Sequence, residues 1–257
     1  MALEFRSVTK QFATGGGRNV LTAVQDISFK VAQSEFVAVV GPSGCGKSTI
    51  LSMTAGLYQP TSGEVLVSEN LVTRPNPRVG FMLQKDLLLP WRTIVKNVEF
   101  GLEARGVPRK ERRERALFEL ERCHLTGFEN HFPYQLSGGM RQRAALARTL
   151  AIDPDIILLD EPFSALDAQT KLLIQNSFAE TIQEAGITTL LITHDLSEAV
   201  IMSDRVLVLS ERPGTIIHEM AVDLPDRAHP LARRQLPEVH RYAAEIFDLL
   251  KLNERAA

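Results

Sequence analysis

The sequence is poor in cysteine, in long apolar runs and in net charge, and each shortage narrows the class of protein. Two cysteines, Cys45 and Cys123, occur among 257 residues, which fits a reducing compartment. The apolar runs fall short of the roughly 18 residues of a membrane span, and Met1–Arg6 does not resemble a signal peptide. A net charge of −2 gives no support for nucleic acid as a partner. Any action at a membrane is therefore expected to require a recruiting partner.

A phosphate-binding loop is the strongest positive signal. Residues 41–49 match the pattern G-x-x-x-x-G-K-[ST]. Glycines allow positive φ and close approach of backbone N–H groups to an anion, at a helix start where the dipole favours negative charge. Lys47 can reach the β- and γ-phosphates, and the Ser48 hydroxyl can hold Mg²⁺. The predicted nucleotide-binding residues here are Gly41, Pro42, Ser43, Gly44, Cys45, Gly46, Lys47, Ser48 and Thr49.

The segments on both sides of this loop support a nucleotide site. An apolar run over residues 35–40 precedes it, and residues 48–56 form a helical pattern that ends at a glycine. The alternative is a chance glycine-rich turn, which should satisfy the pattern in only about one chain in a hundred of this length. Strand, loop and helix in this order favour nucleotide binding.

A second acidic element lies far downstream. The apolar run Ile156–Leu159 is typical of a central parallel strand, and Asp160 and Glu161 follow at its carboxyl end. Asp160 can hold Mg²⁺ directly or through water, and Glu161 can act as general base on the attacking water. Two solvated acids are the alternative, but ligands bind at the carboxyl ends of strands in open parallel sheets.

Gln84 and His194 also follow predicted strands directly. Both should therefore face the same crevice as the two acids. Gln84 can contact Mg²⁺ or the attacking water, and His194 can donate to the γ-phosphate. A lone histidine at a strand end is more often structural, but the neighbouring motifs favour a catalytic role here.

The remaining pattern predicts an α/β chain: a phosphate-loop NTPase core sheet with an N-terminal antiparallel β-subdomain and an inserted α-helical subdomain. The ATPase domain is expected over residues 1–224, with the helical subdomain at about 86–152 and a helical tail at 225–257. A turn is expected at Gly15–Gly17. The helix predicted at 109–123 should carry Ala116, Leu117 and Leu120 on one apolar face, and its basic run is interpreted as a solvated face rather than as a ligand site. Strands are predicted at 3–8, 24–31, 35–40, 63–67, 78–83, 156–159, 188–193, 205–209 and 215–220, and helices at 48–56, 94–104, 109–123, 136–151, 165–184, 197–203 and 238–250.

Ser137, Gly138 and Gly139 form a second anion-binding helix start. The hydroxyl and the glycine amides suit a γ-phosphate. This segment follows the two inserted helices and should lie away from the first loop. One phosphate could meet both loops if two copies of the chain face each other.

Together these motifs resemble the ATP-binding cassette (ABC) ATPases. The resemblance runs from about residue 3 to residue 220, and Leu136–Gln142 (L-S-G-G-M-R-Q) is its most specific element. It implies a head-to-tail dimer, either a homodimer or a pair with a related ATPase subunit, that holds two ATP molecules with Mg²⁺. Ser137, Gly138 and Gly139 would serve the partner's ATP, and Asp167 would line the dimer interface. Spacing alone favours a core position for Phe12, whereas the resemblance gives it the adenine-stacking position, where tyrosine is more usual.

Two further segments, residues 88–93 (L-L-P-W-R-T) and 211–214 (E-R-P-G), are similar to the importer branch for nitrate, sulfonates and taurine, which also handles thiamine-precursor pyrimidines. This implies an ATPase on the cytoplasmic side of the inner membrane, peripheral to an integral membrane permease and indirectly linked to a solute-binding protein. Trp91 is then expected in a groove that receives a permease helix, the alternative being a core position.

Two alternatives remain. The first is a soluble ABC ATPase of DNA repair or translation. Such proteins usually carry a long coiled-coil insertion or two cassettes in one chain, and this sequence shows neither feature. A regulatory module without hydrolysis is disfavoured by the presence of Glu161, Gln84 and His194 together.

Overall fold

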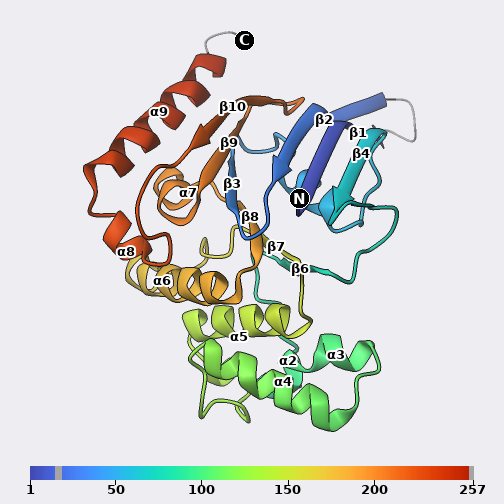
Figure 1. Ribbon diagram of the computed structural model, residues 1–257, viewed down its shortest axis with the longest axis vertical. Helices are drawn as coiled ribbons and strands as arrows, with labels where there is room; N and C mark the ends of the chain where they lie inside the picture. Colours follow the sequence, from blue (N-terminus) through green and yellow to red (C-terminus); the bar gives the residue numbers. More distant parts are fainter. Residues whose placement is uncertain (15–18, 255–257) are drawn as a thin grey trace.

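The computed structural model describes residues 1–14 and 19–254, so the turn expected at Gly15–Gly17 lies outside the described residues. The chain forms two β-sheets and two groups of helices (Figure 1). The α/β fold class with an antiparallel N-terminal sheet and a group of helices inserted between core strands is confirmed. Over the described part of the chain, none of the helices combines the length and the hydropathy needed to cross a membrane.

The larger sheet has six strands in the order β10-β9-β3-β8-β7-β6. All of its neighbouring pairs are parallel except β9 and β10. β3, β7 and β8 are continuous apolar or β-branched runs, and each is buried along nearly all its length, as expected for strands covered on both faces. The strands are β3 (Phe36–Val40), β6 (Val79–Met82), β7 (Ile156–Asp160), β8 (Thr188–Ile192), β9 (Arg205–Leu209) and β10 (Ile216–Ala221).

The smaller sheet is antiparallel in the order β2-β1-β4-β5. Its long hairpin pairs Leu3 with Val31 at one end and Thr14 with Asn19 at the other. Both strands are longer than the alternating patterns predicted. The strands are β1 (Leu3–Thr14), β2 (Asn19–Val31), β4 (Ser62–Val67) and β5 (Asn70–Leu71).

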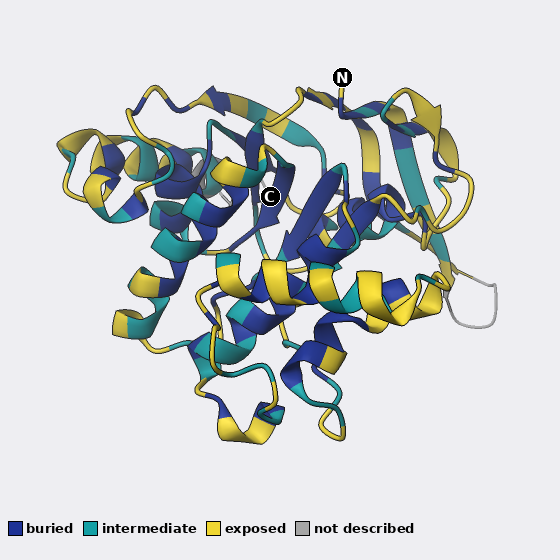
Figure 2. Ribbon diagram, turned by 60° about the horizontal axis from the view of Figure 1, so that its bottom comes forward, coloured by how far each residue is buried: buried dark blue, intermediate teal, exposed yellow. Residues whose placement is uncertain are grey.

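Two hydrophobic cores lie on the two faces of the larger sheet. Side chains along each strand alternate between them: Val37 and Val39 join the core shared with the smaller sheet and α1 (Lys47–Thr54), whereas Ala38 and Val40 join the core covered by helices. The helices on the second face are α6 (Ala168–Ala185), α7 (Leu196–Met202) and α9 (Pro237–Glu254). In Figure 2 the strands of this sheet are buried between these layers.

The inserted helices lie at one end of the molecule, below the larger sheet in Figure 1. The helix predicted at 94–104 is divided at Glu99, and Thr93 occupies the N-cap without a side-chain hydrogen bond. Leu117, predicted on an apolar face, is exposed. The elements are α2 (Ile94–Val98), α3 (Phe100–Ala104), α4 (Arg109–Arg122), the 3-10 turn η2 (Pro133–Gln135) and α5 (Gly138–Ala151).

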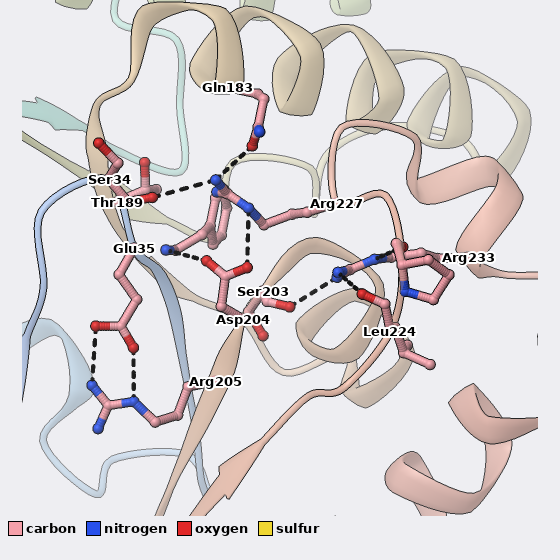
Figure 3. A network of polar contacts seen from close by, with 12 residues as sticks. Ser34, Glu35, Gln183, Thr189, Ser203, Asp204, Arg205, Leu224, Arg227 and Arg233 are labelled. Atoms are coloured by element: carbon pink, nitrogen blue, oxygen red, sulfur yellow. Dashed lines mark hydrogen bonds and ion pairs between the residues drawn. The ribbon is translucent and has the colours of Figure 1, made fainter.

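Arg227 and Arg233, in the segment after β10, form hydrogen bonds and ion pairs with the core (Figure 3). Arg233, at the end of α8 (Pro230–Arg233), is only 3% exposed. Its guanidinium donates to the carbonyls of Leu224 and Pro225 in the tail and to those of Ile201 and Ser203 at the end of α7. These contacts cap the carboxyl end of α7, whose last carbonyls would otherwise lack donors.

Candidate active site

The phosphate loop joins the end of β3 to the start of α1. Gly46 occupies the N-cap of α1 with φ of 101°, a conformation that favours glycine. A Cβ at this position would lie 2.4 Å from Val24 Cγ1 and 2.8 Å from the Ala23 carbonyl oxygen. The loop therefore packs directly against β2, and Gly46 has no room for a side chain.

Lys47 lies folded along this loop. Its ammonium donates to the carbonyl oxygens of Gly41 at 2.8 Å and Pro42 at 2.9 Å, and the residue is buried. The Cys45 thiol lies 3.9 Å from Lys47 Nζ. Burial raises the pKa of that thiol and outweighs the opposing effect of the ammonium. The loop thus holds the Lys47 ammonium at its centre, where its partners are two backbone carbonyls and the Cys45 thiol.

Asp160 ends β7 opposite the start of α1, and Ser48 Oγ lies 3.4 Å from Asp160 Oδ1. Burial raises the pKa of Asp160, because a charged carboxylate is poorly solvated there. A hydroxyl and a carboxylate are oxygen ligands of the kind that Mg²⁺ prefers, with phosphate oxygens and water completing its coordination. Among the described residues no group of three or more His, Cys, Asp or Glu could hold a metal ion, and one carboxylate suffices for a nucleotide-bound magnesium.

Glu161 and His194 meet at the neighbouring strand ends. His194 Nδ1 lies 3.0 Å from Glu161 Oε2. The Glu161 backbone has φ of 49° and donates from its N–H to the Ile192 carbonyl. A non-glycine residue in the left-handed region is strained, and such strain concentrates at functional sites. The geometry directs the Glu161 carboxylate toward the crevice above the phosphate loop.

Gln84 reaches this region through Ser164. Gln84 Nε2 donates to Ser164 Oγ at 3.1 Å, and Ser164 Oγ donates to the Glu161 carbonyl at 2.9 Å. Gln84 itself does not line the crevice. The sequence analysis did not predict Ser164, which lies between β7 and α6, as a site residue.

A cavity of about 600 Å³ lies above the loop. Phe12 lines it and belongs to neither hydrophobic core, so the core interpretation of Phe12 is wrong. Leu21, Ala23 and Arg212 also line the cavity and were not predicted as site residues. Leu21 and Ala23 precede the strand predicted at 24–31, which explains their omission. The residues predicted for the site that line it are Phe12, Gly41, Ser43, Gly44, Gly46, Lys47, Ser48, Thr49, Glu161 and His194.

Ser137, Gly138, Gly139 and Asp167 lie outside this cavity. Ser137 Oγ accepts from Met140 N–H and caps α5, and Asp167 accepts from Thr170 N–H and caps α6. Hydrogen bonding to the Thr170 backbone lowers the pKa of Asp167. A separate hollow of about 240 Å³ is lined by Ser137 and Gly139. Within one chain the second predicted anion site is therefore not part of the first.

A family profile described as "ABC transporter" matches residues 24–164, which include the phosphate loop, Gln84, Ser137–Gly139 and Glu161. The chain belongs to this family. It is an ATP-binding ATPase cassette: the phosphate loop and Glu161 line one cavity, and Asp160 lies beside Ser48 of the loop.

Relatives and solved structures agree with this assignment. The cassette is 45% identical to the uncharacterized ABC transporter ATP-binding protein MJ0412 of Methanocaldococcus jannaschii, over 97% of this chain and 91% of the relative. It is 45% identical to the taurine import ATP-binding protein TauB of Yersinia pestis, over 80% of each. The nitrate import ATP-binding protein NrtD of Synechocystis is 42% identical, over 99% of this chain and 97% of the relative.

Among solved structures, the dimeric, post-hydrolysis state of the ATP-binding cassette MJ0796 bound to ADP and Pi is similar with a TM-score of 0.73. The two sequences are 33% identical, and the match covers 86% of this chain and 99% of that one. The fold of the two proteins is therefore shared over nearly all of the smaller one.

Proposed function

We propose that this cassette hydrolyses MgATP at composite sites in a dimer and so energises uptake of a small solute through a separate membrane permease. The observation that carries the proposal is the meeting of Lys47, Glu161 and His194 at one cavity on the carboxyl edge of the parallel sheet. That edge is where ligands bind in open parallel sheets.

The chemistry follows from the positions of these groups. Lys47 exchanges its loop carbonyls for phosphate oxygens, and the loop amides bind the phosphates at the start of α1. Glu161 accepts a proton from the attacking water, and His194, beside it, contacts the γ-phosphate. Ser48 and Asp160 would hold Mg²⁺, which neutralises charge on the phosphates. Gln84 is coupled to the catalytic Glu161 through hydrogen bonds by way of Ser164, so a change at Glu161 moves Gln84. Phe12 stacks on the adenine ring.

The dimer completes the site. Ser137–Gly139 lies outside the cavity of its own chain, so in this proposal its amides serve the ATP of a second copy or of a related subunit. Asp167, at the N-cap of α6, lines the interface between the copies. The dimeric state of the MJ0796 structure bound to ADP and Pi supports this arrangement.

The names of the relatives support an importer. TauB is named for taurine import and NrtD for nitrate import. We infer a small polar solute of the nitrate, sulfonate or taurine kind, or a thiamine precursor, delivered by a solute-binding protein to a permease that this cassette meets on the cytoplasmic side of the inner membrane. Copurification with the permease, followed by solute binding to its partner protein, tests this assignment. These relatives do not favour a role in DNA repair or translation.

Glu161→Gln tests the catalytic proposal. The variant should bind MgATP with normal affinity and hydrolyse it more slowly by about 10²–10⁴-fold, because the positioned general base is lost. Trapped ATP should also hold the dimer together. Glu184→Gln, in the exposed last turn of α6, is the matched control and should hydrolyse normally. Hydrolysis by Glu161→Gln near the wild-type rate would show that Glu161 is not the base.

A further inference from the structure

The loop between β9 and β10 packs against the phosphate loop, although the two are about 170 residues apart in sequence. Gly214 N–H donates to the Ala23 carbonyl at 3.0 Å, and Gln25 N–H donates to the Gly214 carbonyl at 2.9 Å. A Cβ on Gly214 would lie 2.0 Å from the Cys45 carbonyl oxygen. The backbone of this loop therefore touches both β2 and the phosphate loop.

Arg212 extends from the same loop into the nucleotide cavity. Its Nε donates to the Gly44 carbonyl at 2.9 Å, and its side chain lines the cavity together with Lys47 and His194. Gly44 has φ of +77°, and a Cβ there would lie 2.7 Å from Arg212 Nη2. The absence of a side chain at Gly44 is thus what lets the guanidinium reach the edge of the phosphate loop.

The terminal nitrogens of Arg212 are uncommitted. Among the described residues, none accepts a hydrogen bond from Nη1 or Nη2, and no carboxylate forms an ion pair with this guanidinium. An arginine carries five N–H donors and no acceptor. Its planar fork matches the oxygens of a phosphate in two parallel hydrogen bonds.

The second cation of the cavity differs in this respect. Lys47 Nζ already donates to two loop carbonyls, whereas Arg212 uses only Nε on the protein. An anion in the cavity can therefore accept hydrogen bonds from the terminal nitrogens of Arg212 without breaking any hydrogen bond that the side chain already makes. Residues 211–214 are the segment that resembles an importer branch, and their Arg212 side chain lines the nucleotide cavity.

We propose that Arg212 is a nucleotide-binding residue. It donates from its terminal nitrogens to the phosphate chain and, through Nε, fixes the peptide between Gly44 and Cys45 in the orientation that the phosphate loop requires.

The test compares three variants of the full chain. Arg212→Ala removes both contacts, Arg212→Gln keeps an N–H donor but no charge, and Arg212→Lys keeps the charge. Affinity for MgATP is measured by calorimetry, and affinity for sodium tripolyphosphate by competition, because that probe has phosphates and no nucleoside. Arg74→Ala is the matched control, since Arg74 is exposed and lines a different hollow, near β5.

Arg212→Ala and Arg212→Gln should lose affinity for both probes by about tenfold, the size of a charge-assisted hydrogen bond at an exposed site. Arg212→Lys keeps the charge but lacks the planar fork, so it should recover only part of that affinity. In the Ala and Gln variants the KM for ATP should rise more than kcat falls. Wild-type affinity in Arg212→Gln would overturn the proposal. So would a loss of ATP affinity with unchanged tripolyphosphate affinity, because it would place Arg212 on the nucleoside. If Arg212→Ala does not fold, the Gln and Lys variants decide.

Discussion

At the scale of single residues, Gly214 shows how closely the phosphate loop is packed by its neighbours. Its α-carbon faces the backbone carbonyl of Cys45, and an added methyl would lie 2.0 Å from that oxygen. A flexible side chain could move away from such a contact, but a backbone carbonyl in the phosphate loop cannot move without reshaping the loop.

Gly214→Ala should therefore lower both stability and ATP affinity. We expect a loss of about 1–3 kcal/mol in the free energy of unfolding, as for overpacking of a core, measured by urea denaturation together with ATP calorimetry. Gly127→Ala is the control: Gly127 has φ of +90° but nothing lies within 4 Å of its added methyl. That variant should be destabilised only by backbone strain and should bind ATP normally. Normal ATP affinity in Gly214→Ala would mean that the phosphate loop adapts to this neighbour.

At the scale of elements, a cluster of ion pairs joins α6 to α7. Lys171 Nζ lies 2.9 Å from Asp195 Oδ2 and 2.7 Å from Glu198 Oε2. Glu198 is 2% exposed and also accepts from Gln175. Burial raises the pKa of Glu198, although Lys171 acts in the opposite direction. Because Asp167 caps α6 and His194 lies just before α7, these ion pairs link the proposed dimer interface to the helix that follows His194.

Lys171→Met should destabilise the protein by about 3 kcal/mol, because it leaves Glu198 buried without its cation. The folded-state pKa of Glu198 is already raised above its unfolded value, so its ionised form costs stability as the pH rises. The deficit of Lys171→Met in urea denaturation should thus be larger at pH 8 than at pH 5. The double variant Lys171→Met/Glu198→Gln should recover much of the loss. A deficit that is independent of pH and persists in the double variant would contradict this account.

The sequence predicted the elements well where one physical cause dominates. The apolar strands β3, β7 and β8 are buried on both faces, and the phosphate loop has a fixed pattern of residue types. The prediction for α4 was partly wrong, because Leu117 is exposed while Glu119 is buried between Arg115 and Arg122 at 3.2 and 3.4 Å. The periodicity of apolar residues along a helix cannot show that two arginines will stabilise a buried carboxylate.

Residues of the site that come from distant segments were the least predictable. Phe12 reaches the cavity from β1, and Arg212 reaches it from the loop between β9 and β10. The positions of both elements depend on tertiary packing rather than on the local sequence pattern. Spacing favoured a core position for Phe12, yet the ring contacts Tyr58 edge-on and lies near Lys10 at the rim of the cavity. The roles of Ser137–Gly139 and Asp167 depend on a second copy of the chain, and they stay predictions.

At the scale of the whole molecule, the turn that leads into the inserted helices exposes a tryptophan. Trp91 is 72% exposed, so its core alternative is wrong, whereas its neighbour Leu88 is buried. Trp91 borders a groove of about 740 Å³ whose other walls are mainly charged, among them Lys96 and Arg109. An exposed aromatic anchor beside a polar groove is typical of a protein interface.

Trp91→Ala should leave the ATPase rate and stability of the isolated cassette almost unchanged, because the ring is exposed in the single chain. It should weaken assembly with the permease or uncouple transport, measured by copurification and by solute uptake into vesicles. Leu71→Ala, at a half-exposed residue of β5 in the other sheet, is the control. Normal assembly and uptake by Trp91→Ala would remove this residue from the docking surface.

The enclosure of the phosphate loop has a consequence for the thermodynamics of nucleotide binding. Val24 lies against Gly46 on one side and Gly214 against Cys45 on another, while Lys47 holds the loop carbonyls from within. A loop confined in this way loses little conformational entropy when a nucleotide arrives. The binding free energy from its amides is then available for affinity instead of being consumed in ordering the chain, which is the advantage of preorganisation.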